Sequence, residues 1–218
     1  MITTPVNDPI DICYFCGEGN ANTKEDIPPR SLFPKGHGCE LIKVPAHLKC
    51  NQEWGDSIEY VRNLLSGLSP FNPTARNLFE KRVRSLDRKP PLRLKMVNEL
   101  RRKIDIYSQG GIYLGSQPGV QINSNLMNQF VSHMVKGLYY HHKNNILPKG
   151  ATINWRIQPR DEAPDWISRL PIIMVHPEVF RYRYSILDDH PEWSTWILGF
   201  YDLSIGTIMA ISGRNHNP

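Results

Sequence analysis

The sequence contains no long apolar run, and this excludes a membrane-spanning helix. The longest candidates, Ile172–Val175 and the interrupted stretch Leu203–Ile211, are much shorter than the roughly 20 residues that a bilayer requires. The first twelve residues hold two Asp, two Pro and no basic residue, which is unlike a secretory signal peptide. We therefore expect a soluble, cytoplasmic protein that does not act at a membrane.

Other absences exclude further classes of protein. The glycines between Gly110 and Gly119 are not followed by the Gly-Lys-Ser/Thr of a phosphate-binding loop, so this stretch is expected to be a loop or a short hairpin. There is no internal repeat. With 40% hydrophobic and 10% aromatic residues, the 218-residue chain is not mainly disordered. Its length suits one large domain, or a small module joined to a second one.

The charge is unevenly distributed. The formal net charge is +5, and the segment 76–103 holds eleven of the 26 Lys and Arg but only three of the 21 Asp and Glu. Such a segment attracts phosphate backbones. Two solvated basic helix faces would explain the same composition, so charge permits nucleic-acid binding without demonstrating it.

No cysteine follows residue 50. Cys13 and Cys16 form a CxxC, and His47 and Cys50 form an HxxC about thirty residues later. This spacing predicts a tetrahedral Cys3His zinc site, which is structural because four protein ligands leave no position for water. Cys39, in a Gly-His-Gly-Cys loop, is expected to be a spare thiol, with replacement of His47 as ligand left as an alternative.

Two other uses of these cysteines are disfavoured. A disulfide is not expected in a chain without an export signal. A redox CxxC needs a preceding strand and a helix that opens at the first Cys, whereas Asp8-Pro9 and Gly17-Glu18-Gly19 flank this motif. Zinc would supply on the order of ten kcal/mol of folding free energy to a segment too short to bury a large core.

The residues between and after the cysteine pairs suggest a treble clef. Thr23–Phe33 and Leu41–Pro45 indicate a hairpin between the two zinc-binding turns. A helix follows, with apolar residues at spacings of three and four: Trp54, Ile58, Val61, Leu65 and Leu68. The order zinc turn, hairpin, zinc turn, helix is the layout of a treble-clef module.

The combined motif resembles the zinc-containing branch of the HNH endonucleases. The resemblance covers about residues 10–65 and rests on the CxxC, on Thr23-Lys24-Glu25-Asp26-Ile27-Pro28-Pro29, on Val44-Pro45-Ala46 with Cys50-Asn51, and on Glu59-Tyr60. The family hydrolyses phosphodiesters with a ββα-metal core and one divalent cation. It therefore implies a catalytic Mg²⁺ or Mn²⁺ besides the structural zinc.

The resemblance also implies roles for individual residues. Glu25 occupies the position of the metal-binding acid, Asp26 that of the general-base His and Asn51 that of the orienting Asn. Glu59, with Asp56 as an alternative, falls near the late metal-binding His. Both family His residues are thus replaced by acids here. A carboxylate can still accept a proton from an activated water.

Two alternatives concern this site. His37, on the loop after Phe33, is a candidate substitute base. The Glu25-Asp26 pair has a purely structural explanation, as a turn or helix cap before Pro28-Pro29, and Asn51 has one as a residue that bonds a turn backbone.

Beyond Leu68, two basic amphipathic helices are expected, over about 73–87 and 92–106. Their basic faces are candidate surfaces for binding the nucleic-acid backbone beside the zinc module. Their candidate contacts are Arg76, Lys81, Arg82, Arg84, Arg101, Arg102 and Lys103.

A long helix from Ser124 to about Asn144 is expected to place His133 on its polar face and His142 at the edge of its apolar stripe. After residue 149 the apolar residues alternate, which predicts an antiparallel sheet.

The sequence therefore predicts an α+β protein in three parts: a zinc module (8–68), a helical region (69–148), and a β region (149–218) that shares a core with the helices. The favoured function is an HNH-like endonuclease that acts on DNA more than on RNA. The alternative is a zinc-finger protein that binds nucleic acid without cleaving it. A third hypothesis is a structural protein whose β region docks a protein partner or a second copy.

Overall fold

The computed structural model describes residues 12–86, 103–120, 122–159, 164–202 and 206–214. Within these ranges the chain is a mixed α+β protein with three antiparallel sheets. One hairpin pairs β1 (Thr23–Ile27) with β2 (Ile42–Ala46), and another pairs β3 (Lys103–Tyr107) with β4 (Tyr113–Pro118). None of the described helices is long and apolar enough to cross a membrane.

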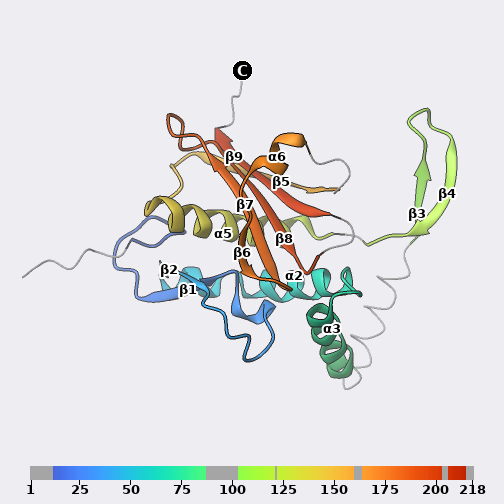
Figure 1. Cartoon of the computed structure of the whole chain (residues 1–218), viewed down its shortest axis with the longest axis horizontal. Helices are drawn as coiled ribbons and strands as arrows, with labels where there is room; N and C mark the ends of the chain where they lie inside the picture. Colours follow the sequence, from blue (N-terminus) through green and yellow to red (C-terminus); the bar gives the residue numbers. More distant parts are fainter. Residues whose placement is uncertain (1–11, 87–102, 121, 160–163, 203–205, 215–218) are drawn as a thin grey trace, which may run out of the picture.

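The third sheet confirms the predicted C-terminal antiparallel region. Its strand order is β5-β9-β8-β7-β6, and every neighbouring pair is antiparallel (Figure 1). One side of the central strand β8 carries Trp196, Leu198 and Phe200, all fully buried, as the alternating pattern predicts. The five strands are β5 (Ala151–Gln158), β6 (Ile173–His176), β7 (Phe180–Ile186), β8 (Ser194–Phe200) and β9 (Thr207–Arg214).

Helix α5 (Ser124–Lys143) connects the N-terminal segment 12–54 to this sheet. Asn123 caps its start by accepting the Leu126 N–H, and Asn144 ends it in the left-handed conformation at φ 48°. The helix contacts β1, β2, β5 and α2 (Gly55–Gly67). Buried residues of this N-terminal segment, of α5 and of the sheet form one hydrophobic cluster. The predicted stripe of α5 is buried: Met127, Phe130, Val131, Met134, Val135 and Leu138.

The prediction that His133 is a surface residue is wrong. Its side chain is fully buried because the N-terminal segment covers this side of α5. The imidazole stacks between the rings of Phe15 and Trp54, at centroid distances of 3.7 and 4.4 Å. A helical wheel identifies the apolar face of a single helix. It does not show which distant segments of the chain pack against the polar face of that helix. His142 is half-buried as expected, with Nε2 2.9 Å from the Tyr182 hydroxyl.

Helix α3 (Pro73–Leu86) confirms the first predicted basic helix. Asn72 accepts the Ala75 N–H and donates to the Glu178 carbonyl, while the Thr74 hydroxyl donates to the Glu178 carboxylate at 2.7 Å. These bonds fix the start of α3 to the turn between β6 and β7.

The second predicted basic helix is wrong at its C-terminal end. Residues 92–102 lie outside the described ranges, but Lys103–Tyr107 form strand β3. Ile104 and Ile106 alternate with polar residues, and Gly111, at φ 80°, allows the turn that returns the chain into β4. Figure 1 shows this hairpin standing apart from the body of the protein.

Candidate metal centre and the acidic residues beside it

Four side chains converge where the sequence predicts zinc. The ligand atoms of Cys13, Cys16, His47 and Cys50 all lie within 4.8 Å of one another. Within the part of the chain that the structure describes, this is the one group of three or more Cys, His, Asp and Glu that could hold a metal ion. Three sulfurs and one imidazole are the donor set of a structural zinc site.

Backbone geometry builds the first half of the site. The Gly17 N–H donates to the Cys13 carbonyl, and the Cys13 N–H donates to the Glu18 carbonyl, both at 2.9 Å. Gly17 has a φ of 80°, which a residue with a side chain rarely adopts. An added Cβ there would lie 2.8 Å from Ile146 Cδ1. The tight turn therefore requires the glycine that follows the CxxC.

The second half of the site lies at the start of α1 (Leu48–Gln52). His47 is the N-cap of this helix, and Cys50 lies within it. The His47 Nε2 is 2.8 Å from the Gly19 carbonyl, to which it donates, so Nδ1 carries the lone pair and faces Cys16 Sγ at 3.4 Å. A carbonyl that fixes the tautomer of a metal-binding His is a common feature of zinc sites.

The surroundings of the clustered thiols also shift their pKa values. Burial and the charge of Cys13 raise the pKa of Cys50 to about 12. Burial also acts to raise the pKa of Cys13, but the N–H groups of Cys16, His47 and Phe15 outweigh it and lower that pKa. A divalent cation would favour the thiolate at all three cysteines.

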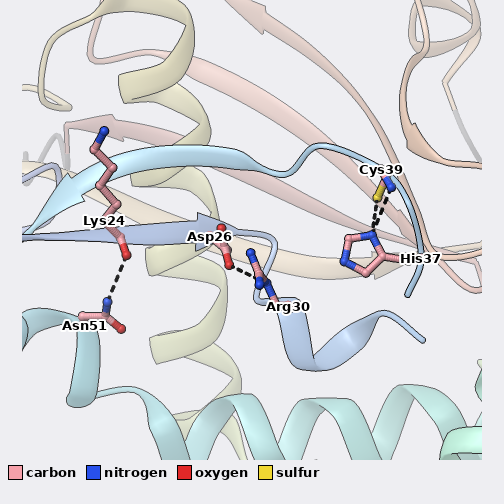
Figure 2. Close-up of polar contacts among 6 residues, drawn as sticks. All are labelled: Lys24, Asp26, Arg30, His37, Cys39 and Asn51. Atoms are coloured by element: carbon pink, nitrogen blue, oxygen red, sulfur yellow. Dashed lines mark hydrogen bonds and ion pairs between the residues drawn. The ribbon is translucent and has the colours of Figure 1, made fainter. Parts of the chain in front are cut away.

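Cys39 is not one of the four clustered ligands, so the alternative in which it replaces His47 is wrong. Its Sγ lies 2.9 Å from His37 Nδ1, which also accepts the Cys39 N–H at 3.2 Å. Figure 2 shows both residues on the loop that leads toward β2. The Nδ1 atom of His37 therefore interacts with Cys39 of the same loop.

Glu25 points into the protein. It is 6% exposed, and Trp54 Nε1 donates to its carboxylate at 3.4 Å. Burial is the main reason that the pKa of Glu25 rises to about 7, with the charge of Asp26 adding to the effect. Glu25 thus faces the core between the β1–β2 hairpin and α5.

Asp26 points the other way, because adjacent residues of a strand face opposite sides. Its carboxylate accepts a hydrogen bond from Arg30 Nε at 3.1 Å. Asn51 Nδ2 donates to the Lys24 carbonyl at 3.4 Å, which fixes α1 to the same strand. Figure 2 shows Asn51 at the Lys24 carbonyl and Asp26 further along β1, directed to Arg30.

The remaining acidic candidates do not join Asp26. Glu59, on α2, accepts from Arg82 Nη1 of α3 at 2.5 Å. Asp56 is exposed in the first turn of α2. The structure therefore pairs Asp26 with Arg30, joins Asn51 to the backbone of Lys24 on the same strand, places Glu25 on the opposite face, and pairs Glu59 with a neighbouring helix.

The predicted nucleic-acid contacts are mostly exposed. Arg76, Lys81 and Arg84 are exposed on α3, and Lys103 is exposed on β3. Arg82 is partly buried through its pairing with Glu59. Arg101 and Arg102 lie outside the described residues.

The sequence interpretation missed the buried polar group around Glu25. Trp54 and His133 each have a hydrophobic or surface explanation at their own positions, and only the packing of α5 against α2 and β1 brings them together beside Glu25. The comparisons add no relative, since no protein-family model, no curated protein and no solved structure matches this chain.

Proposed function

We propose that the chain is an HNH-like endonuclease that hydrolyses phosphodiester bonds of nucleic acid, DNA in preference to RNA. In this proposal the N-terminal segment is a treble-clef module held by one structural zinc at Cys13, Cys16, His47 and Cys50. The observation that carries the proposal is the hydrogen bond from Asn51 to the Lys24 carbonyl. It fixes the helix that bears a zinc ligand against β1, the strand that carries the outward carboxylate of Asp26.

The chemistry assigned to Asp26 is proton acceptance. A water molecule attacks phosphorus, its proton passes to the Asp26 carboxylate, and the bond from phosphorus to the leaving oxygen breaks, with that oxygen taking up a proton from solvent water. Arg30, which is 68% exposed beside Asp26, would stabilise the negative charge that develops on the phosphate. Asn51 would orient the site through the bond that fixes α1 to β1.

The residues present do not form the family's site for a catalytic Mg²⁺ or Mn²⁺. Glu25, the acid that the resemblance assigns to this ion, faces the core, and Glu59 is bound to Arg82. On the outward face, Asp26 supplies one carboxylate, while the amide of Asn51 donates to the Lys24 carbonyl. We therefore route no step through a catalytic ion, and the divalent cation remains a variable of the assay.

A second candidate is a zinc module that binds nucleic acid without cleaving it. The inward position of Glu25 favours this function, because an HNH centre requires an acid beside the general base. It predicts one equivalent of zinc, salt-dependent binding, and no cleavage with either cation.

A plasmid-nicking assay separates the two. Zinc-loaded protein would be tested with Mg²⁺, with Mn²⁺ and with neither, beside Asp26→Ala and the matched control Asp189→Ala, which removes an exposed carboxylate between β7 and β8. Nicking that is lost in the first variant and kept in the control supports hydrolysis at Asp26. Equal nicking by both variants excludes Asp26 as the base, and His37→Ala then tests the substitute. Absence of nicking by the unaltered, folded protein supports the binding module.

A further inference from the structure

The outward face of the β1–β2 hairpin is basic. Side chains alternate along a strand, so Lys24 lies on the face opposite to Glu25 and shares its side with Asp26. The register pairs Asp26 with Lys43 and Lys24 with Pro45. Lys24 and Lys43 are therefore diagonal neighbours on one face, where Cα atoms are about 7–8 Å apart. Both are exposed.

This face of the hairpin carries more positive charge than is needed to neutralise the carboxylate of Asp26. Asp26 is neutralised by Arg30. Within the described residues, neither lysine forms an ion pair. Glu40, which precedes β2, is exposed, but no ion pair links it to Lys43. Two unneutralised ammonium groups thus flank the outward Asp26 carboxylate.

The basic face of α3 is the competing surface. Arg82, one of its predicted contacts, already binds Glu59, which lowers the charge available there. Lys81 and Arg84 remain exposed on the same helix. The sequence favoured the cations of α3 because they lie on one face of a single predicted helix. The lysines of the hairpin are nineteen positions apart and only the register brings them together.

We propose that the phosphate backbone of a nucleic acid lies across the outward face of the β1–β2 hairpin, contacted by Lys24, Lys43 and Arg30, and not across α3. The inference rests on the proposed function, since it identifies how the same site takes its substrate. It follows from charge complementarity, because a polyanion is the ligand that a face with unneutralised ammonium groups favours. Lysine side chains are long and flexible, so they suit contacts to phosphates and not to base edges.

Two double variants with the same loss of charge test the proposal. Lys24→Gln with Lys43→Gln alters the hairpin, and Lys81→Gln with Arg84→Gln is the matched control on α3. All four side chains are exposed, and zinc content and thermal unfolding would verify that both variants are folded. Binding to a fluorescent DNA duplex and to its single strand would be followed by anisotropy over a range of NaCl concentrations.

The hairpin variant should bind at least about 10-fold more weakly at 0.1 M salt, and its log–log salt slope should fall by about two, since each lost phosphate contact removes about 0.9. The control should stay within about 2-fold. Loss in the control alone would place the nucleic acid on α3, and equal loss in both would mean that only net charge matters. Either result overturns the proposal.

Failure of the proposed function is distinguishable from failure of this inference. If the unaltered protein binds neither DNA form, both fall. If it binds through the hairpin but cuts nothing in the nicking assay, the binding face stands and hydrolysis falls. If it cuts and the α3 variant alone loses binding, hydrolysis stands and the hairpin face falls.

Discussion

The indole of Trp54 stacks on the imidazole of His133 with centroids 4.4 Å apart and planes 8° apart. The same indole donates its N–H to Glu25, and His133 Nδ1 lies 2.8 Å from the hydroxyl of Tyr14, the residue after Cys13. His133 Nε2 is buried and has no hydrogen-bond partner among the described residues. The segment that carries the Cys3His cluster is therefore joined to α5 through a buried polar group that contains the carboxyl of Glu25.

Glu25→Gln should stabilise the protein, and the gain should grow with pH. Burial raises the pKa of Glu25 from 4.5 to about 7, so between these values the folded state holds a proton that the unfolded state has lost. The wild type is then destabilised as pH rises, by up to about 1.4 kcal/mol per pH unit. Gln does not titrate. Urea unfolding at pH 5.5, 6.5 and 7.5, with zinc present, should show a difference that grows to about pH 7 and then levels.

His133 acts in the opposite direction and should mask part of this effect in the wild type. Burial lowers the pKa of His133 from 6.5 to about 3. Below pH 6.5 the unfolded state takes up a proton that the folded state does not, so stability falls as pH falls. The Gln variant should therefore lose stability on acidification more visibly than the wild type. A constant difference between the two proteins at all three pH values would contradict the assignment of Glu25.

Removal of zinc should unfold the N-terminal segment. The unaltered chain should carry one equivalent of zinc, and Cys16→Ser should lose it, together with several kcal/mol of stability. Cys39→Ser is the matched control, since Cys39 lies outside the cluster and bonds His37 instead. Zinc content by mass spectrometry and thermal unfolding would measure both. Loss of zinc in the control would show that the fourth ligand is misassigned.

The clustering of Cys13, Cys16, His47 and Cys50 could be predicted because their spacing in the sequence reports local turns. A CxxC followed by Gly17 and an HxxC at a helix start are short motifs whose geometry depends on few residues. The sheet and α5 followed in the same way from periodicity. Trp196 in the sheet and Met134 on the helix are fully buried, as alternation and helical spacing required.

The acidic site could not be predicted to the same degree, because it depends on which face of β1 meets α5. Consecutive positions made Glu25 and Asp26 look like one site, while strand alternation places them on opposite sides. The prediction of a surface position for His133 was wrong for a related reason, since its surroundings come from residues more than seventy positions away. The prediction that Lys103 lies in a helix was wrong, because its charge fitted a helix face whereas pairing with β4 determines its conformation.

Lysine at two apolar positions of the β3–β4 hairpin should leave the free energy of unfolding almost unchanged. Ile112 is 68% exposed and Leu114 is 65% exposed, so little burial is lost in Ile112→Lys with Leu114→Lys, and a change within about 0.5 kcal/mol is expected for each. Light scattering should show less self-association, because exposed apolar patches promote it. A loss of several kcal/mol in urea unfolding would instead mean that these side chains pack against the body.

Gly137→Ala should destabilise the protein even though alanine is the better helix former. Gly137 lies in α5 where it crosses β1, and an added Cβ would lie 2.6 Å from Ile27 Cγ1 and 2.8 Å from Cδ1. The helix or the strand must shift, at a cost of about 1–3 kcal/mol, which exceeds the gain of up to about 1 kcal/mol in helix propensity. Gly55→Ala is the control, since its Cβ would meet open space at the start of α2. Urea unfolding should show a loss for Gly137→Ala and a small gain for Gly55→Ala, and a gain in both would mean that α5 does not pack this closely on the strand that holds Glu25 and Asp26.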